Sequence, residues 1–219
     1  MITNEPYVDL SFKIRSNAPL WSDHGFSLFG AVSRLFPDAH EANGIGILPI
    51  AGSQIGERRI QLNEHSRLTL RIPSGDIARW LPLAGKTVDV AGVSLQVGIP
   101  EIRVLIPATA LRSRLVTTKN CQDQSRFEAE IRRQLTAIGV SDEAIVSVGK
   151  RRTIRIHGKE VVGYELVIEG LTADESIAIQ TAGLGGRRHM GCGVFVPLLP
   201  KVIHCDRSLQ KQSPRQVNH

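Results

Sequence analysis

The chain has 219 residues, of which 42% are hydrophobic, a composition typical of a folded protein with one large domain or two small ones. Its first residues lack the basic and apolar regions of a signal peptide, and its apolar runs are far shorter than the roughly 20 residues that span a bilayer. Three cysteines without a CxxC pair argue against a disulfide framework and against a thiolate zinc site. We therefore expect a cytoplasmic protein that has no membrane partner and no metal site.

The net charge of +6 comes entirely from the second half of the chain. Residues 1–110 hold ten basic and ten acidic side chains, whereas residues 111–219 hold seventeen and eleven. This asymmetry indicates a polyanionic partner bound mainly by the second half, although a solvated basic face explains the charge equally well. Aromatic residues are only 5% of the chain, so we expect phosphate contacts to matter more than base stacking on exposed rings.

The first half of the chain predicts strand, helix, strands, helix and strand, in that order. Residues 8–15 alternate apolar and polar side chains and predict a half-buried strand. A helix follows over residues 24–36, with Asp23 as its N-cap and apolar side chains along one face. Three short strands are predicted before Pro73, a short helix comes next, and residues 86–108 supply one or two further strands.

The same order of elements begins again in the second half. Residues 111–119 predict a strand and residues 125–140 predict an amphipathic helix. Residues 153–171 predict a hairpin that turns at His157 and Gly158. A helix that ends in glycines and a short final strand complete the pattern.

Each of the two series matches βαββαβ, the order of the ferredoxin-like fold. We therefore predict an α+β fold of two tandem ferredoxin-like units, with a glycine-rich loop near the C-terminus. The predicted division places the first unit at residues 1–107, the second at residues 108–205 and a flexible polar tail at residues 206–219.

A glycine-rich segment, AGLGGRRHMGCGVFVP, lies between the last predicted helix and the last predicted strand. It is not a Walker A loop, because Cys192 and Gly193 stand where the lysine and hydroxyl residue must be, and its spacing does not match the dinucleotide fingerprint. Helix C-caps explain one or two of its glycines but not five. We expect its backbone amides and cations to hold a phosphate chain. The residues assigned to this site are Gly183, Gly185, Gly186, Arg187, Arg188, His189, Gly191 and Gly193.

The segment GLGGRRHMGCGVFVP, at the end of two ferredoxin-like units, resembles the signature of the RAMP superfamily of CRISPR-associated proteins. The likeness is greatest to the repeat-processing endoribonucleases of that superfamily, in the variety of the MYXAN subtype. The segments DHGFSLFGAVSRL, GILPI, LRSRLV and LTADESI resemble the same family, so the likeness covers nearly the whole chain, from about Val8 to Leu198.

The resemblance implies a protein that cuts precursor CRISPR RNA within each repeat and often stays bound to the product. In that family the 2′-hydroxyl attacks its own phosphodiester without a metal or another cofactor, and the products carry a 2′,3′-cyclic phosphate and a 5′-hydroxyl. The implied partners are CRISPR repeat RNA, as precursor and mature guide, and other subunits of a CRISPR effector complex. Two alternatives remain open: a RAMP-type subunit that binds CRISPR RNA without cutting it, and a ferredoxin-like sensor of a small ligand.

Histidine suits the proton transfers of this reaction near neutral pH, and two of the seven histidines are the catalytic candidates. His24 begins the first predicted helix, where the helix dipole favours a neutral imidazole, and its rival role is a structural bond to the backbone. His40 lies just past that helix and is followed by Glu41, as in one arrangement of the family. Because the helix is about 18 Å long, we expect only one of the two to be catalytic.

The chain departs from that family arrangement at two positions. In the family the helix carries a tyrosine and a lysine follows the histidine. This chain has only Tyr7 and Tyr164, and the first lysine after His40 is Lys86. The candidates for the missing cation are Arg34, Arg58 and Arg59.

The remaining basic residues are predicted to position the RNA. Arg112 and Arg114 alternate with apolar neighbours, which places both on one face of the strand that opens the second unit. A second basic group precedes and enters the predicted hairpin. Its members are Lys150, Arg151, Arg152 and Arg155.

Overall fold

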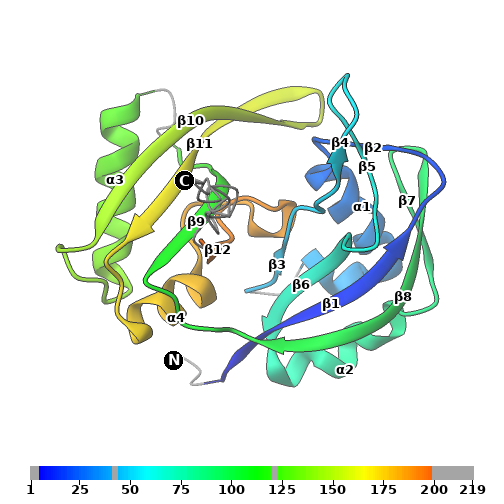
Figure 1. Ribbon diagram of the computed structural model, residues 1–219, viewed down its shortest axis with the longest axis horizontal. Coiled ribbons are helices and arrows are strands. Elements are labelled where there is room, and N and C mark those ends of the chain that lie inside the picture. The colour runs from blue at the N-terminus through cyan, green and yellow to red at the C-terminus, as the bar shows by residue number, and fades with distance from the viewer. Residues whose placement is uncertain (1–4, 41–43, 120–122, 199–219) are drawn as a thin grey trace, which may run out of the picture.

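The structure is a computed structural model that describes residues 5–40, 44–119 and 123–198, apart from the side chains of Asp38 and His40. The predicted tail at residues 206–219 lies outside the described residues. Two sheets stand side by side, the first on the right and the second on the left of Figure 1. Among the described residues, no helix has the length and apolar character needed to cross a membrane. The cytoplasmic location stays a prediction.

The first unit is an antiparallel sheet of five strands. Its strand order is β3 (Gly46–Ile47), β6 (Arg67–Pro73), β1 (Tyr7–Arg15), β8 (Val93–Val104) and β7 (Thr87–Val90). Helix α1 (Gly25–Leu35) and the single turn α2 (Ile77–Trp80) contribute Leu28, Val32 and Trp80 to the core that the sheet builds with residues such as Leu10 and Phe12. Period-2 alternation along the strands and period-3.6 spacing along the helix direct these apolar side chains to one core.

The second unit is an antiparallel sheet of four strands. Its order is β10 (Ile145–Ile156), β11 (Lys159–Glu169), β9 (Ala110–Val116) and β12 (Val196–Pro197). Helix α3 (Gln124–Ala137) buries Phe127, Ile131 and Leu135, and helix α4 (Ala173–Ala182) buries Ile179 in the same core. Thr172 and Glu175 form a capping box at the start of α4, which satisfies two backbone groups at this helix end.

In both units the strands follow the order second, third, first, fourth, which confirms the predicted α+β fold of two ferredoxin-like units. Strand β7 is an addition to the first unit. A further small sheet in the first unit, separate from the ferredoxin-like sheet, consists of β2 (Leu20–Trp21), β5 (Arg59–Gln61) and β4 (Ser53–Gln54). The last strand of the first sheet, β8, ends at Val104, and the first strand of the second sheet, β9, begins at Ala110. The division of the chain into two domains at residue 107 stays a prediction.

Some local predictions were wrong. Asp23 is not the N-cap of α1: His24 takes that position, and the Asp23 carboxylate instead accepts a hydrogen bond from the backbone N–H of Arg155, at 2.8 Å. Strand β10 begins at Ile145, so Lys150 to Arg152 lie within the strand and not before the hairpin. The sequence did not predict the first part of β10, because consecutive cations are uncommon in a half-buried strand.

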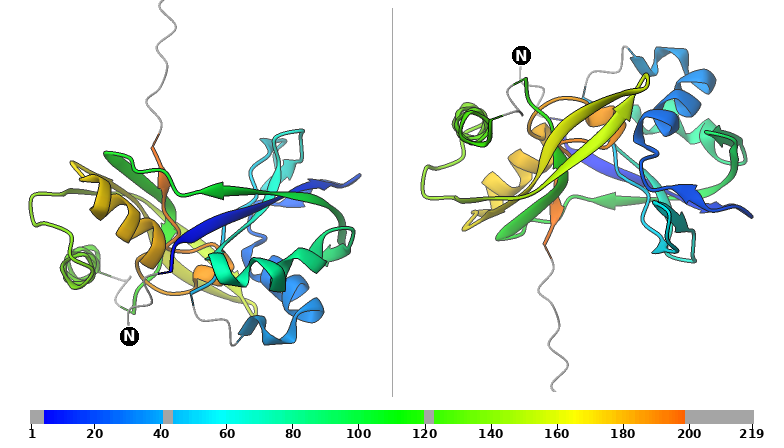
Figure 2. Two further views of the ribbon diagram at one scale, coloured as in Figure 1. Left: turned by 90° about the horizontal axis from the view of Figure 1, so that it is seen from below. Right: turned by 90° about the horizontal axis from the view of Figure 1, so that it is seen from above.

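Contacts hold the units together on opposite sides of the space between them. Arg71 of β6 is buried, forms a two-point ion pair with Asp9 of β1 at 2.7 and 2.9 Å, and donates to the carbonyl oxygens of Gln180 and Phe195 in the second unit. On the other side, the tip of the β10–β11 hairpin reaches α1 (Figure 2). There the ring of His157 meets the ring of Phe26 at a centroid distance of 4.7 Å.

Candidate active site and nucleic-acid interface

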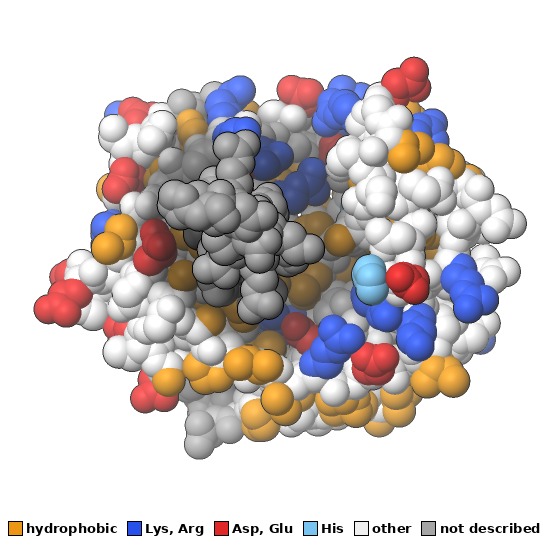
Figure 3. Space-filling view, in the orientation of Figure 1, with side chains coloured by type: hydrophobic (Ala, Val, Ile, Leu, Met, Phe, Trp, Pro, Cys, Tyr) orange, Lys and Arg blue, Asp and Glu red, His pale blue; other side chains and the backbone are white. Residues whose placement is uncertain are grey.

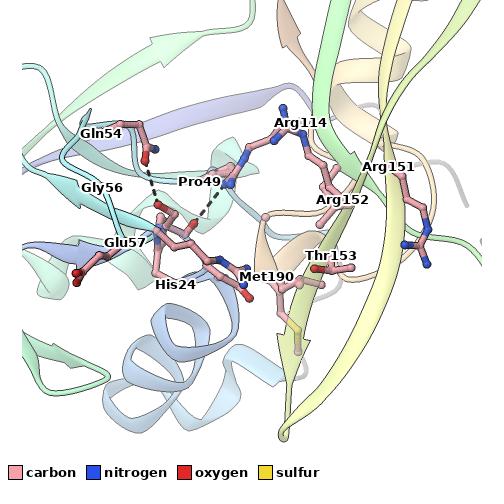
Figure 4. A pocket seen from close by; sticks show the side chains of 17 residues that line it. His24, Pro49, Gln54, Gly56, Glu57, Arg114, Arg151, Arg152, Thr153 and Met190 are labelled. Atoms are coloured by element: carbon pink, nitrogen blue, oxygen red, sulfur yellow. Dashed lines mark hydrogen bonds between the residues drawn. The ribbon is translucent and has the colours of Figure 1, made fainter.

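A cleft of about 650 Å³ opens between the two units (Figure 4). The segment from Ser22 to Gly25 and the β4–β5 turn form its wall in the first unit. Strands β9 and β10 form the opposite wall, and Met190 and Gly191 of the glycine-rich loop also line it. Residues from the start, middle and end of the chain therefore meet at one place, as expected of a site built by two units.

Arginines dominate this cleft, which we call the arginine cleft. Arg58, Arg114, Arg151 and Arg152 line it, and an adjoining cavity of about 420 Å³ adds Arg112. Figure 3 shows Lys and Arg side chains along the upper wall of the hollow in the middle of this face. Arg152 pairs with Glu165 at 3.1 Å, whereas Arg112, Arg114 and Arg151 form no ion pair with a described carboxylate. The cleft thus presents cations that a polyanion can neutralise.

The electrostatics of Arg114 support the same interpretation. Two causes lower the pKa of Arg114: the larger is burial of its guanidinium, and the second is repulsion by the nearby guanidinium of Arg152. A guanidinium nevertheless stays charged at any physiological pH. Two like charges held close together in a partly buried site raise the affinity for an anion placed between them.

His24 is held as a structural residue. Its side chain is buried, its Nδ1 lies 2.8 Å from the carbonyl oxygen of Trp21, and its Nε2 lies 2.9 Å from the backbone nitrogen of Ile50. The second contact requires Nε2 to accept a hydrogen bond, so the neutral imidazole carries its proton on Nδ1 and donates it to Trp21. Both nitrogens are then engaged, although His24 lines the arginine cleft. The geometry favours the structural role that the sequence left open, and a catalytic role for His24 stays a prediction.

We expect the stability of the protein to fall as the pH drops below about 7, because burial lowers the pKa of His24 from its usual value near 6.5. Below that value the unfolded chain binds a proton at this residue that the folded chain does not bind, so acid favours unfolding. The slope from this one group is at most about 1.4 kcal/mol per pH unit. Urea unfolding between pH 5 and pH 8 measures it. The slope should be smaller in His24→Gln than in the wild type, and an equal slope in the two proteins would contradict the assignment.

The other histidine candidates have different positions. His40 ends the 3₁₀ helix Pro37–His40 that follows α1, and its side chain lies outside the described residues, so its catalytic role stays a prediction. His189 of the glycine-rich loop packs against Phe29 of α1, with a centroid distance of 4.2 Å. This contact brings the loop to the first helix, next to the arginine cleft.

The backbone amides of the loop glycines have hydrogen-bond partners within the protein. The amide of Gly185 donates to the Gln134 side chain, that of Gly186 to the carbonyl of Thr117, and that of Gly193 to the carbonyl of Leu115. The amides of Gly183 and Gly191 donate to carbonyls of nearby residues. These amide donors are therefore already bound within the protein, and the RNA-binding assignment of the five glycines stays a prediction.

Close backbone packing explains most of these glycines. Gly183, Gly185, Gly191 and Gly193 have positive φ angles between 65° and 82°. A Cβ at Gly193 would clash with the carbonyl oxygen of Leu184, and one at Gly185 would clash with that of Thr117. Only glycine allows the loop to press against its own backbone and against the end of β9. RNA contact by other groups of the loop stays a prediction.

The two loop arginines point in different directions. Arg187 is exposed, and its guanidinium lies 3.4 Å from the hydroxyl of Thr117. Arg188 donates to the carbonyl of Thr181 at 2.7 Å, and burial lowers its pKa. Its guanidinium turns inward toward α4, and its role as an RNA contact stays a prediction. Arg187 is the loop cation that remains accessible to a phosphate.

The remaining basic residues are divided between the cleft and the hairpin. Of the three candidates for the missing cation, only Arg58 lines the arginine cleft. Arg34 instead donates to the carbonyl of Asp89, and Arg59 lies over the ring of Trp21. Arg155 lies near the hairpin tip, 3.8 Å from Glu160. Lys150 is exposed on β10.

Sequence reasoning missed Gln54, Glu57 and Thr153, which also line the cleft. Gln54 ends β4, and the β4–β5 turn that follows has φ angles of +45° at Glu57 and +58° at Arg58. The motif Gly56-Glu57-Arg58 between two short polar strands was the available signal, since glycine next to polar residues marks a tight turn. Nothing in the sequence indicated that this turn faces the second unit.

Comparisons with known proteins agree with this architecture. A model of the Cas6 family, described as Cas6 Crispr, matches residues 8–199. The CRISPR-associated endonuclease Cas6 of Myxococcus xanthus strain DK1622 is 40% identical over 191 residues, which are 87% of this chain and 81% of that protein.

Solved structures share the fold at low sequence identity. A CRISPR associated protein Cas6 superposes with a TM-score of 0.62 at 14% identity, over 90% of this chain and 100% of its own. A protein described as a RAMP protein that binds different RNA substrates has a TM-score of 0.58 at 13% identity, over 87% of this chain and 98% of its own. The resemblance stated from the sequence is confirmed by the family match and by the Myxococcus relative. The chain belongs to the Cas6 family of CRISPR-associated endonucleases.

Proposed function

We propose that this chain is an endoribonuclease that cuts precursor CRISPR RNA within its repeats. The observation that supports the proposal best is the arginine cleft, which lies between the two units of a Cas6-family chain and has several guanidinium groups on its walls, of which those of Arg112, Arg114 and Arg151 form no ion pair with a carboxylate of the described residues. Such a cleft binds the phosphates of a folded RNA strand, and the cation density also stabilises negative charge that develops on a reacting phosphate.

The reaction that we propose is intramolecular. The 2′-oxygen of the nucleotide before the cut forms a bond to the adjacent phosphorus, and the bond from phosphorus to the 5′-oxygen of the next nucleotide breaks. A base removes the proton of the 2′-hydroxyl and an acid donates a proton to the leaving oxygen, so the products carry a 2′,3′-cyclic phosphate and a 5′-hydroxyl. No metal takes part in this scheme.

Arg114 and Arg152 are the residues proposed to neutralise the charge of the phosphorane-like transition state, because both guanidiniums face the same space (Figure 4). His40 is proposed as the residue that transfers a proton. The engagement of both nitrogens of His24 by the backbone supports this choice, since an imidazole that already donates and accepts hydrogen bonds has no site left for the RNA.

The direct test is a cleavage assay in the presence of EDTA. Purified protein should cut its cognate repeat RNA at one position, and the upstream product should carry a cyclic phosphate that acid converts to a 2′- or 3′-phosphate. Replacing the 2′-hydroxyl at the cut site by hydrogen should abolish cutting but not binding. RNA that stays uncut under these conditions, with intact binding, would show the alternative function, a subunit that binds CRISPR RNA without cutting it. Cutting only when magnesium is added would refute the proposed chemistry.

Removing the two central arginines together should weaken RNA binding in a manner that depends on salt. Neutralising one phosphate fewer reduces the slope of log Kd against log salt concentration by about 0.7 to 0.9, so Arg114→Ala with Arg152→Ala should reduce it by about 1.5. Filter binding at several potassium chloride concentrations measures the slope. Arg126→Ala is the matched control, because Arg126 is an exposed residue of α3 that does not line the cleft. Equal slopes for the double variant and the control would contradict the assignment.

A further inference from the structure

A second pocket opens beside the arginine cleft, at the tip of the β10–β11 hairpin. Its volume is about 360 Å³, within the range of roughly 300 to 1,000 Å³ that is typical of small-ligand sites. Three separate parts of the chain form it: the segment that joins β2 to α1, the β4–β5 turn, and the hairpin tip. In Figure 1 the hairpin tip approaches the small sheet at the upper right. We call this cavity the hairpin pocket.

The hairpin pocket has aromatic walls, which the arginine cleft lacks. Trp21 is 41% exposed, and the guanidinium carbon of Arg59 lies 3.9 Å from the centre of its ring. Phe26 and His157 contribute a pair of rings that meet at an interplanar angle of 63°. An exposed tryptophan supported by a guanidinium is a surface on which a nucleobase stacks, and such stacking is insensitive to the identity of the base.

The charges in the hairpin pocket are balanced, in contrast to those in the arginine cleft. Arg58 and Arg155 are matched by Asp23 and Glu160, and Arg155 lies 3.8 Å from Glu160. A phosphate would meet two carboxylates here and gain little. A neutral, planar and polar group fits better, because the carboxylates accept hydrogen bonds from exocyclic amino groups and the guanidiniums donate to ring nitrogens and carbonyl oxygens.

The hairpin pocket adjoins the arginine cleft, since Asp23 and Arg58 line both. The Asp23 carboxylate accepts a hydrogen bond from the backbone N–H of Arg155, so the boundary between the two cavities is fixed within the protein. We propose that the hairpin pocket binds one unpaired nucleobase of the RNA whose phosphates occupy the arginine cleft, and that Trp21 is the stacking surface. This inference rests on the proposed function, because it takes the same RNA as the ligand.

Tryptophan fluorescence provides a direct test. The chain has two tryptophans, and the other one, Trp80, is fully buried against Phe36. A repeat RNA with a 2′-deoxy substitution at the cut site should therefore quench the emission of Trp21 alone. Trp21→Phe should keep a ring for stacking and bind the RNA nearly as well, but its residual emission should not respond to RNA.

A double-mutant cycle between protein and RNA identifies the base. Single nucleotides near the cut site are replaced one at a time by abasic nucleotides, and the Kd is measured for the wild type and for Trp21→Ala. One abasic position should weaken binding by the wild type about ten- to hundredfold. The same change should have little further effect on Trp21→Ala, which is already weakened by a similar factor.

The possible results separate the two proposals. Quenching that persists in Trp21→Phe, or abasic effects that are equal in both proteins at every position, would overturn the hairpin-pocket inference while leaving the endoribonuclease proposal in place. A wild-type protein that neither binds nor cuts repeat RNA would overturn both. If an RNA base stacks on Trp21 but the protein binds the repeat RNA without cutting it, the hairpin-pocket inference is supported and the endoribonuclease proposal is refuted.

Discussion

Replacing His40 by alanine is expected to slow RNA cutting by a factor of about 100 to 10,000 and to leave RNA binding within about twofold of the wild type. The physical reason is that a positioned acid or base acts on the proton in the transition state, while the arginine cleft supplies most of the attraction for the RNA. Single-turnover cutting of the cognate repeat RNA measures the first quantity. Filter binding with the 2′-deoxy RNA measures the second.

His24→Ala is the informative comparison, because it should fail in a different way. Removing the imidazole leaves the carbonyl of Trp21 and the N–H of Ile50 without their partner, and each unsatisfied buried group costs about 1 to 3 kcal/mol. We expect reduced thermal stability and a moderate loss of both binding and cutting. A His24→Ala protein that is as stable as the wild type and binds RNA but does not cut would transfer the catalytic role from His40 to His24.

Replacing Arg71 by methionine is expected to destabilise the protein by about 3 to 5 kcal/mol. The side chain of Arg71 is 1% exposed, and its removal would leave Asp9 without its ion-pair partner and the carbonyls of Gln180 and Phe195 without a donor. Urea unfolding at neutral pH measures the change. The matched control is Arg103→Met, because Arg103 is 57% exposed and pairs with Glu101 at 2.8 Å on the surface of the same sheet.

The control should change the free energy of unfolding by no more than about 1 kcal/mol, as exposed ion pairs do. Replacing Asp9 together with Arg71 by apolar residues should restore part of the stability, since it removes the uncompensated charge. Equal effects of Arg71→Met and Arg103→Met would contradict the large contribution to stability that we assign to the buried contacts of Arg71.

The fold was predictable from the sequence because both units are built from regular alternation and helical periodicity. The pattern of residues 111–116 placed Arg112 and Arg114 on one face, and both indeed line the adjoining cavities between the units. The start of β10 was not predictable, because the charged run from Lys150 to Arg152 masks the alternation of a long strand that is exposed on one side.

The site was predictable only in part, because its decisive contacts join residues that are distant in the sequence. The sequence pattern around Arg71 predicts only a strand residue, because its partners in the second unit lie more than 100 positions away along the chain. The glycine-rich loop does line the cleft between the units, but its amides are bound by Thr117, Leu115 and Gln134, which no local pattern reveals. Trp21 was overlooked because the low aromatic content suggested that stacking would be unimportant.

The contacts on the two sides of the cleft also determine which molecule must adapt when RNA binds. On one side of the cleft, Arg71 of the first unit donates to the carbonyl of Gln180 in the second unit. On the other side, the backbone N–H of Arg155 in the second unit donates to Asp23 in the first. Neither side is therefore free to act as a hinge. A preorganised receptor of this kind loses little conformational entropy on binding. The ordering penalty therefore falls on the RNA, and a repeat that is already folded in its bound shape will be selected over one that must first rearrange.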